Sequence, residues 1–206
     1  MARRTKEDAL ATRHRLLDAA ERVFQEKGVS RTSLNDIALA AGTTRGAIYW
    51  HFQDKADLFN AMLERVTLPL EAAFQEVGLD RGRDPLPLLR ESILQALRRT
   101  AADEQTRRVF EVATLKVEYI DELGAIRARQ IAVRQQFLQR MQRALLAGAR
   151  WRGRRLPMPA AAAARGLHAL VDGLIRDWLL DDSAFDLVRT ASATIDAYLA
   201  GLGLGD

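Results

Sequence analysis

Cysteine is absent from this sequence of 206 residues, and histidine occurs only three times, as His14, His51 and His168. Without cysteine, no disulfide and no thiolate metal site can form. Long apolar stretches are also missing, since no run approaches the roughly 18 residues that span a bilayer. The first residues are charged and lack the apolar segment of a secretory signal. We therefore expect a cytoplasmic protein that does not bind a membrane.

The residue patterns of common enzymes are missing as well. No cluster of histidine and carboxylate residues has metal-ligand spacing, and there is neither a glycine-rich phosphate loop nor a nucleophile elbow. We expect no catalytic residue, no metal and no cofactor, and an enzyme is the main alternative from another class. The formal net charge of +4 is too small for this length to indicate a nucleic-acid partner by itself.

Helix-forming residues dominate the composition, and β-branched runs with a period of two are missing. This pattern predicts an all-α protein of about nine helices. We expect them over about residues 8–27, 33–41, 43–51, 54–78, 85–100, from 103, 121–149, 160–180 and from 183. Candidate caps are Thr32 or Ser33, Asp54, Asp84 before Pro85, Asp103, Asp121, and Asp182 or Ser183.

Two of the expected helices are short and are joined through Ala41-Gly42-Thr43, the minimal layout of a helix-turn-helix. Gly42 suits a sharp turn because it has no Cβ. The second helix of such a pair lies in the major groove, so its outward side chains should contact DNA. The predicted DNA contacts are Thr32, Ser33, Thr43, Thr44, Arg45, Gly46, Tyr49, Trp50, His51 and Lys55.

These residues have distinct expected roles. Arg45 can read guanine through O6 and N7, and Gly46 lets the backbone approach the groove. Thr44, Tyr49 and His51 can hold phosphates or touch a thymine methyl group. Lys55 stands at a helix start, where the helix dipole disfavours a cation, so a neighbouring phosphate would explain it. The alternative is that the aromatic cluster is ordinary core, as expected of Ile48 and Phe52.

Residues 31–59 resemble the TetR family of regulators. The likeness rests on Gly-Ala-Ile-Tyr-Trp-His-Phe at 46–52, with Lys55 and Leu58 following. Together with the Arg-Arg-Thr-Lys start, this stretch is similar to the AcrR-type repressors of multidrug efflux pumps, as are residues 106–108 and 171–180. The resemblance implies that residues 1–54 form the DNA-binding domain and that residues 55–206 form a helical domain for ligand binding and dimerisation.

The resemblance also implies a large apolar cavity among the fifth to eighth helices. The candidate ligand contacts are Leu89, Ile93, Phe110, Thr114, Phe137, Met141, His168, Val171, Asp172 and Ile175. Apolar walls with a few polar anchors suit a promiscuous site, and Asp172 is the favoured anchor. The alternatives are that half of these residues are plain packing, that Asp172 pairs with Arg176, and that His168 is a core residue.

The last two helices carry apolar stripes on more than one face, which favours a four-helix interface between two copies. The candidate interface residues are Leu167, Leu170, Leu174, Ile195, Tyr198, Leu199 and Leu202, although such stripes also occur in simple cores. A symmetric dimer would place two recognition helices about 34–36 Å apart, which predicts a pseudo-palindromic operator.

The expected function is a repressor that a hydrophobic small molecule releases from its operator, with a multidrug efflux operon as the controlled target. Ligand binding would shift the helix that starts at Lys55. Two alternatives keep DNA binding: a regulator of catabolic, lipid or envelope genes, and a nonspecific DNA-compacting protein. The second would use the cluster of Arg150, Arg152, Arg154 and Arg155, which can also be a solvated loop.

Overall fold

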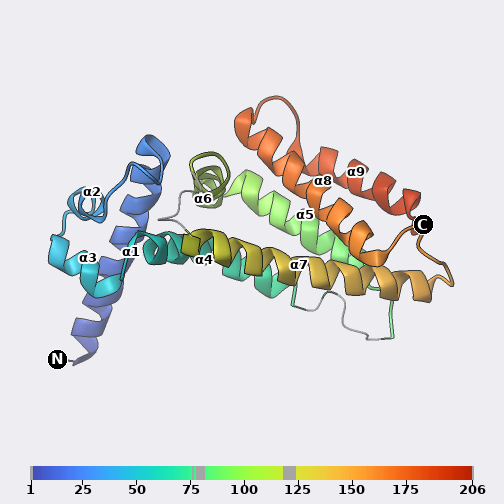
Figure 1. The fold of residues 1–206 in the computed structure, drawn as a ribbon, viewed down its shortest axis with the longest axis horizontal. Coiled ribbons are helices and arrows are strands. Elements are labelled where there is room, and N and C mark those ends of the chain that lie inside the picture. The colour runs from blue at the N-terminus through green and yellow to red at the C-terminus, as the bar shows by residue number, and fades with distance from the viewer. Residues whose placement is uncertain (1, 76, 78–81, 118–123, 206) are drawn as a thin grey trace. The chain divides into compact units, whose positions relative to one another are not determined.

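A computed structural model describes residues 2–75, 77, 82–117 and 124–205 (Figure 1). These residues form nine α-helices and no strand, which confirms the all-α prediction. The helices are α1 (Ala2–Lys27), α2 (Leu34–Ala40), α3 (Arg45–His51), α4 (Lys55–Ala73), α5 (Leu86–Ala102), α6 (Glu104–Leu115), α7 (Gly124–Trp151), α8 (Ala160–Leu180) and α9 (Leu187–Gly201). No helix in the described ranges is long and apolar enough to cross a membrane.

The helices belong to two compact units. Unit 1 contains residues 1–68 and 108–130, and unit 2 contains residues 69–107 and 131–206. Helices α4, α6 and α7 each contribute residues to both units. The expected boundary between residues 54 and 55 does not coincide with the division into these two units, and a functional boundary there stays a prediction.

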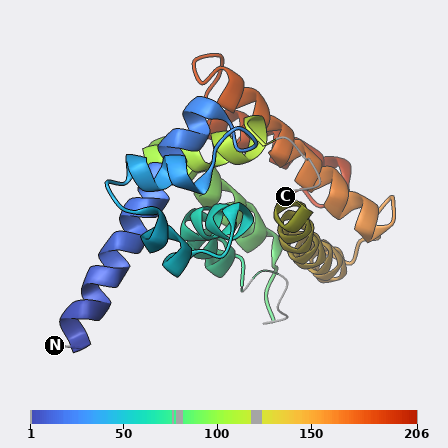
Figure 2. The same ribbon diagram turned by 60° about the vertical axis from the view of Figure 1, so that its left-hand side comes forward.

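In unit 1, α2 and α3 lie beside α1 in both ribbon views (Figures 1 and 2). The core contains Leu16 and Phe24 of α1, Ile37 of α2, Ile48 of α3 and Phe59 of α4, none of which exposes any surface. Each such side chain gains roughly 1.5–3 kcal/mol from burial. Helical spacing of apolar residues therefore fixes how the two short helices sit on α1.

Polar contacts add specificity to this core. Arg65 of α4 bridges two carboxylates of α1: it pairs with Asp18 at 2.8 Å and with Glu21, whose side chain is buried. The Gln25 amide donates to Glu111 of α6 at 2.9 Å, and the Val29 N–H donates to the Lys116 carbonyl at 3.1 Å. The second half of α6 is thus bonded directly to α1.

In unit 2, α9 packs against both α5 and α8. Arg90 of α5 bonds to Asp196 and Ser192 of α9, and the Tyr198 hydroxyl donates to the Ala163 carbonyl at 2.9 Å. Gly166 permits this close approach, because a Cβ there would lie 2.3 Å from the Tyr198 hydroxyl oxygen.

Several expected helix ends differ from the structure. Helix α1 begins at Ala2 rather than near residue 8, and α4 ends at Ala73 rather than near Gly78, since the Phe74 N–H turns back to the Glu71 carbonyl. The prediction that Asp182 or Ser183 caps α9 is wrong, because Asp186 accepts the cap bond from the Arg189 N–H at 2.8 Å.

Of three other expected caps, one is wrong, one is confirmed and one cannot be compared with the structure. Pro85 rather than Asp84 is the N-cap of α5 and is not the first helical residue, although Asp84 still accepts from the Leu86 N–H at 3.0 Å. The predicted Asp103 cap is confirmed, with its carboxylate accepting from the Thr106 N–H at 3.0 Å. The expected cap at Asp121 lies outside the described residues.

Candidate DNA interface and ligand site

The turn between α2 and α3 is built by two caps and a glycine. Ser33 caps α2, with its hydroxyl accepting from the Asp36 N–H at 3.1 Å and its own N–H donating to Asp36 at 2.9 Å. Gly42 has a φ of +64°, which side chains other than glycine rarely adopt. Thr44 then caps α3 by accepting from the Ala47 N–H at 3.2 Å. The predicted helix-turn-helix is present.

Helix α3 has one buried side and one exposed side. Ile48 is fully buried, whereas Tyr49 exposes 50% and Trp50 exposes 74% of its surface. Thr44, Arg45 and Gly46 are also exposed, and Thr43 is half-buried. The two aromatic side chains are therefore not core. A helix of only seven residues that exposes them presents a surface suited to a partner.

Two contacts order this exposed surface. The Arg45 guanidinium lies 5.7 Å from the centre of the Tyr49 ring, a cation–π arrangement that limits the freedom of both side chains. The half-buried His51 ring stands edge-on to Trp50 at 4.8 Å. Burial, and to a lesser degree the Arg13 charge, lowers the pKa of His51. His51 is therefore neutral at pH 7 and offers one donor and one acceptor.

Two of the predicted contacts are used inside the protein. Thr32 is buried, and its hydroxyl donates to the Gly28 carbonyl at 2.7 Å, so this side chain does not face a partner. The Lys55 ammonium donates to the Ser30 carbonyl at 3.1 Å. This hydrogen bond explains why a lysine stands at the start of α4, and no neighbouring phosphate is needed to explain it. Both side chains fix the loop between α1 and α2.

The predicted ligand contacts fall into three groups. Leu89, Ile93 and Met141 are buried in the core of unit 2, as the packing alternative expected. Phe137, His168, Val171 and Ile175 are half-buried in unit 2, and Asp172 is exposed there. Phe110 and Thr114 are half-buried residues of unit 1.

The polar candidates in unit 2 are close to one another. Burial lowers the pKa of His168, Asp172 raises it, and Arg134 and Arg165 lower it further. His168 is therefore neutral at pH 7. The alternative ion pair of Asp172 with Arg176 is not formed among the described residues, and the role of Asp172 as a polar anchor stays a prediction.

The predicted dimer residues are mostly core of a single chain. Leu167, Ile195, Leu199 and Leu202 expose at most 6% of their surface, so the expectation that they face a second copy is corrected. They pack between α5, α8 and α9. Leu170, Leu174 and Tyr198 remain half-exposed. Periodicity alone could not separate these cases, because one apolar stripe suits either kind of packing.

The exposed side of these two helices carries small residues instead: Ala169 on α8, and Ala193, Ala197 and Ala200 on α9. Sequence reasoning missed this face. The spacing of three, four and seven residues among the α9 alanines was the available signal, since it marks one side of a helix. Small side chains allow close approach of a second helix.

Comparison with known proteins assigns the chain to a family. Residues 16–62 match the model of bacterial regulatory proteins of the tetR family, and residues 84–203 match the C-terminal region of MAATS-type transcriptional repressors. The chain belongs to the TetR family. It is therefore a transcriptional regulator rather than an enzyme.

The relatives of this TetR-family protein have similar lengths and folds. The transcriptional regulator TtgR of Pseudomonas putida is 41% identical, covering 99% of this chain and 97% of its own. NalD, the secondary repressor of the MexAB-OprM multidrug efflux pump in Pseudomonas aeruginosa, is 40% identical with a TM-score of 0.85, covering 95% and 97%.

SmeT, the repressor of the Stenotrophomonas maltophilia multidrug efflux pump SmeDEF, has been solved in complex with triclosan. In that complex it is 36% identical with a TM-score of 0.81, covering 93% of this TetR-family chain and 91% of its own. The expected likeness to repressors of multidrug efflux pumps is confirmed by these relatives. No group of side chains suited to holding a metal ion occurs in the described parts of the chain.

Proposed function

We propose that this chain is a cytoplasmic repressor that binds a pseudo-palindromic operator as a homodimer and is released by hydrophobic small molecules. Its target would be a multidrug efflux operon, as the names of NalD and SmeT state for those proteins. The observation that carries the proposal is the exposed side of α3, where Arg45, Tyr49 and Trp50 face outward from a buried Ile48.

The exposed side of α3 suits the major groove. Arg45 offers two parallel N–H donors to guanine, and Thr44 and Tyr49 offer hydroxyl groups to phosphates. Gly46 has no side chain, and the place where a Cβ would stand is open apart from the Thr44 hydroxyl oxygen at 3.9 Å. The backbone could therefore approach DNA closely at this residue. Ser33, Thr43, Trp50 and His51 complete the proposed contacts. Lys55 would support these contacts through its hydrogen bond to the loop between α1 and α2.

The proposed ligand contacts are the half-buried apolar side chains of unit 2. Phe137 of α7 stands edge-on to the buried Phe74 at 5.1 Å, so its ring is held in place and would give a ligand an aromatic surface. Val171 and Ile175 add aliphatic surface, and neutral His168 beside Asp172 supplies polar anchors. Phe110 and Thr114 of α6 stay proposed contacts. A ligand here would favour a shifted α4 and lower the affinity for the operator.

Two copies are proposed to pair through the exposed alanine faces of α8 and α9. Four helices with small facing residues can approach closely and bury the half-exposed Leu170 and Leu174. Twofold symmetry would then present two α3 helices to successive major grooves, which is the reason to expect a pseudo-palindromic operator.

A binding measurement with DNA from upstream of the gene tests this function. Labelled fragments from that region should bind with a specificity ratio of about 10³ or more over unrelated DNA at the same salt concentration. Protection mapping should then locate a pseudo-palindrome. Equal affinity for unrelated DNA would instead indicate a compacting protein, and no DNA binding would refute the proposal.

A further inference from the structure

Acidic residues are missing from one long stretch of this chain. Between Glu122 and Asp172 the sequence contains ten arginines and neither aspartate nor glutamate. The positive charge of this stretch exceeds the formal net charge of +4 of the whole chain, so the remaining residues are acidic in balance. The stretch covers α7, the turn after it and the first half of α8. A small net charge for the protein thus coexists with one strongly cationic segment.

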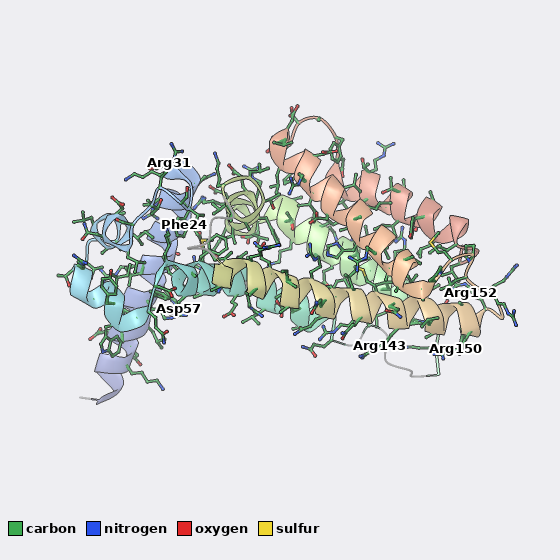
Figure 3. All side chains as sticks on the ribbon, in the orientation of Figure 1. Phe24, Arg31, Asp57, Arg143, Arg150 and Arg152 are labelled. Atoms are coloured by element: carbon green, nitrogen blue, oxygen red, sulfur yellow. The ribbon has the colours of Figure 1, made fainter. Side chains whose placement is uncertain are left out.

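The end of α7 and the turn that follows it combine this positive charge with apolar side chains. We call this surface the basic tip, and its members are Arg143, Leu146, Arg150, Trp151, Arg154, Arg155 and Met158. All seven are exposed, with Trp151 at 58%, Met158 at 41% and Leu146 at 40%. Arg143, Leu146 and Arg150 lie on one side of α7, because they follow at spacings of three and four residues. Figure 3 labels Arg143 and Arg150 near the end of this helix.

The turn that carries the basic tip has a fixed backbone. Arg152 turns inward and pairs with Asp84 at 2.5 Å, where both side chains expose only 18% of their surface. Gly153 takes a φ of +60°, and the Arg154 N–H closes the helix end on the Ala149 carbonyl at 2.8 Å. The four arginines of the basic tip form no ion pair with any residue that the structure describes. Their charge is therefore presented to solvent.

The two kinds of side chain in the basic tip call for a partner with two kinds of surface. A guanidinium pairs with phosphate, whereas exposed apolar side chains gain by leaving water. Duplex DNA would pair with the arginines but would leave Trp151, Leu146 and Met158 in water. The surface of an anionic bilayer offers both, because phosphate groups lie directly above hydrocarbon. Tryptophan is enriched at this level of a membrane, and arginine reaches headgroups from an aliphatic stem.

A second protein would also offer charge and apolar surface, but it would favour side chains that are ordered before binding. Arg45 of α3 is of that kind, since it is held over the Tyr49 ring. The arginines of the basic tip have no such partner among the described residues, and Trp151 contacts no other described aromatic ring. A fluid bilayer needs no matched shape. The unpartnered side chains therefore favour a bilayer over a protein.

We propose that the basic tip binds the surface of anionic phospholipid bilayers. Its arginines pair with lipid phosphates, and Trp151 and Met158 enter the boundary between headgroups and acyl chains. The expectation that the protein does not bind a membrane rested on a missing apolar run, which is needed for spanning but not for surface binding. The basic tip contains no residue of the alanine faces of α8 and α9, so a closed dimer carries it twice. Two tips on one particle raise the avidity.

Flotation with vesicles of defined composition tests this contact. The full chain should bind vesicles of equal parts phosphatidylglycerol and phosphatidylcholine, less so as salt rises, and should bind phosphatidylcholine alone about tenfold or more weakly. Arg150→Gln with Arg154→Gln should weaken binding to the anionic vesicles about tenfold or more, because two attractive charges are lost. Arg98→Gln with Arg99→Gln is the matched control and should bind like the parent. It removes two exposed arginines of α5 and gives the same net charge.

The insertion of Trp151 has a readout of its own. Phosphatidylglycerol with brominated acyl chains should quench part of the tryptophan fluorescence of the parent. Trp151→Phe should lose that quenching while it still binds the vesicles, because phenylalanine keeps an apolar ring. Trp50 and Trp178 remain in both proteins, so the difference reports Trp151 alone. Circular dichroism melting checks that each variant is folded.

Other results would overturn the proposal. These are a parent protein that does not bind the anionic vesicles, a tip variant that binds them as well as the α5 control does, or quenching that survives Trp151→Phe. The variant of Arg150 and Arg154 should keep the affinity of the parent for unrelated duplex DNA. A loss of that affinity without vesicle binding by the parent would assign the basic tip to DNA, and binding of polyglutamate in place of vesicles would assign it to an acidic polypeptide.

Discussion

At the scale of single residues, Arg45 and Tyr49 form the most specific feature of the exposed side of α3. The guanidinium is held over the ring at 5.7 Å, which orients its donors before DNA arrives. Preordered side chains lose less entropy on binding. Arg45→Ala should therefore weaken specific operator binding by about 1–3 kcal/mol while affinity for unrelated DNA changes little.

Fluorescence anisotropy at fixed salt measures this effect of Arg45→Ala. Arg98→Ala is the control, because Arg98 is an exposed arginine of α5 that pairs with Glu91. Equal affinity of Arg45→Ala and the parent for the operator would mean that the recognition helix has been misplaced.

His168 gives a second prediction at this scale. Burial lowers its pKa in the folded protein below the usual 6.5, so the unfolded chain binds more protons. The stability that neutral His168 contributes is fully present above pH 6.5 and is lost as the pH falls through the folded pKa. Urea unfolding at pH 7.5 and pH 5.5 should show a smaller loss of stability for His168→Gln than for the parent.

Replacement of an exposed histidine serves as the control for His168. His14→Gln should keep the pH dependence of the parent, because His14 lies on the exposed side of α1. If His168→Gln loses as much stability as the parent between the two pH values, a pKa of His168 lowered by burial does not cause the pH dependence.

The sequence predicted the exposed aromatics correctly but not which of two adjacent hydroxyls would be buried. Thr32 and Ser33 are equivalent as capping residues. The path of the chain after Gly28 decides between them, since it brings Thr32 over the Gly28 carbonyl and leaves Ser33 at the helix start. That path depends on Val29, which is buried and bonded to Lys116, a residue remote in sequence.

At the scale of elements, the junction of α1 with α4 depends on a partly buried ion pair. Glu21 exposes 2% of its surface and faces Arg65. Removal of the cation leaves a carboxylate in a site with little water, so Arg65→Ala should lower the free energy of unfolding by about 3 kcal/mol. Chemical denaturation measures this change.

A surface pair provides the comparison for Arg65. Arg98 and Glu91 are both about half exposed, so Arg98→Ala should change stability by less than about 1 kcal/mol. Equal effects of Arg65→Ala and Arg98→Ala would contradict the role assigned to the buried Glu21.

Helix ends were predicted best where one capping residue stood alone. Asp103 is such a case and caps α6. Before α9, by contrast, Asp181, Asp182, Ser183 and Asp186 are all able to cap. The choice of Asp186 follows from the burial of Leu187 directly after it, a tertiary effect that local pattern does not contain.

At the scale of the whole molecule, the sequence predicted nine helices and a helix-turn-helix but not the membership of the compact units. Residues 108–130 join residues 1–68 through contacts such as Gln25 with Glu111, which are 86 residues apart. Helical periodicity describes each helix alone, so it also could not tell that Leu167 and Ile195 pack within one chain.

The central claim is that a hydrophobic ligand and operator DNA oppose each other on this protein. The direct measurement is the affinity for the operator, at constant salt, at increasing concentrations of a hydrophobic compound that calorimetry has shown to bind the protein. The bound compound should lower operator affinity by about 5–150-fold, and operator DNA should lower the affinity for the compound by the same factor. A compound that binds the protein yet leaves operator affinity unchanged would contradict this coupling.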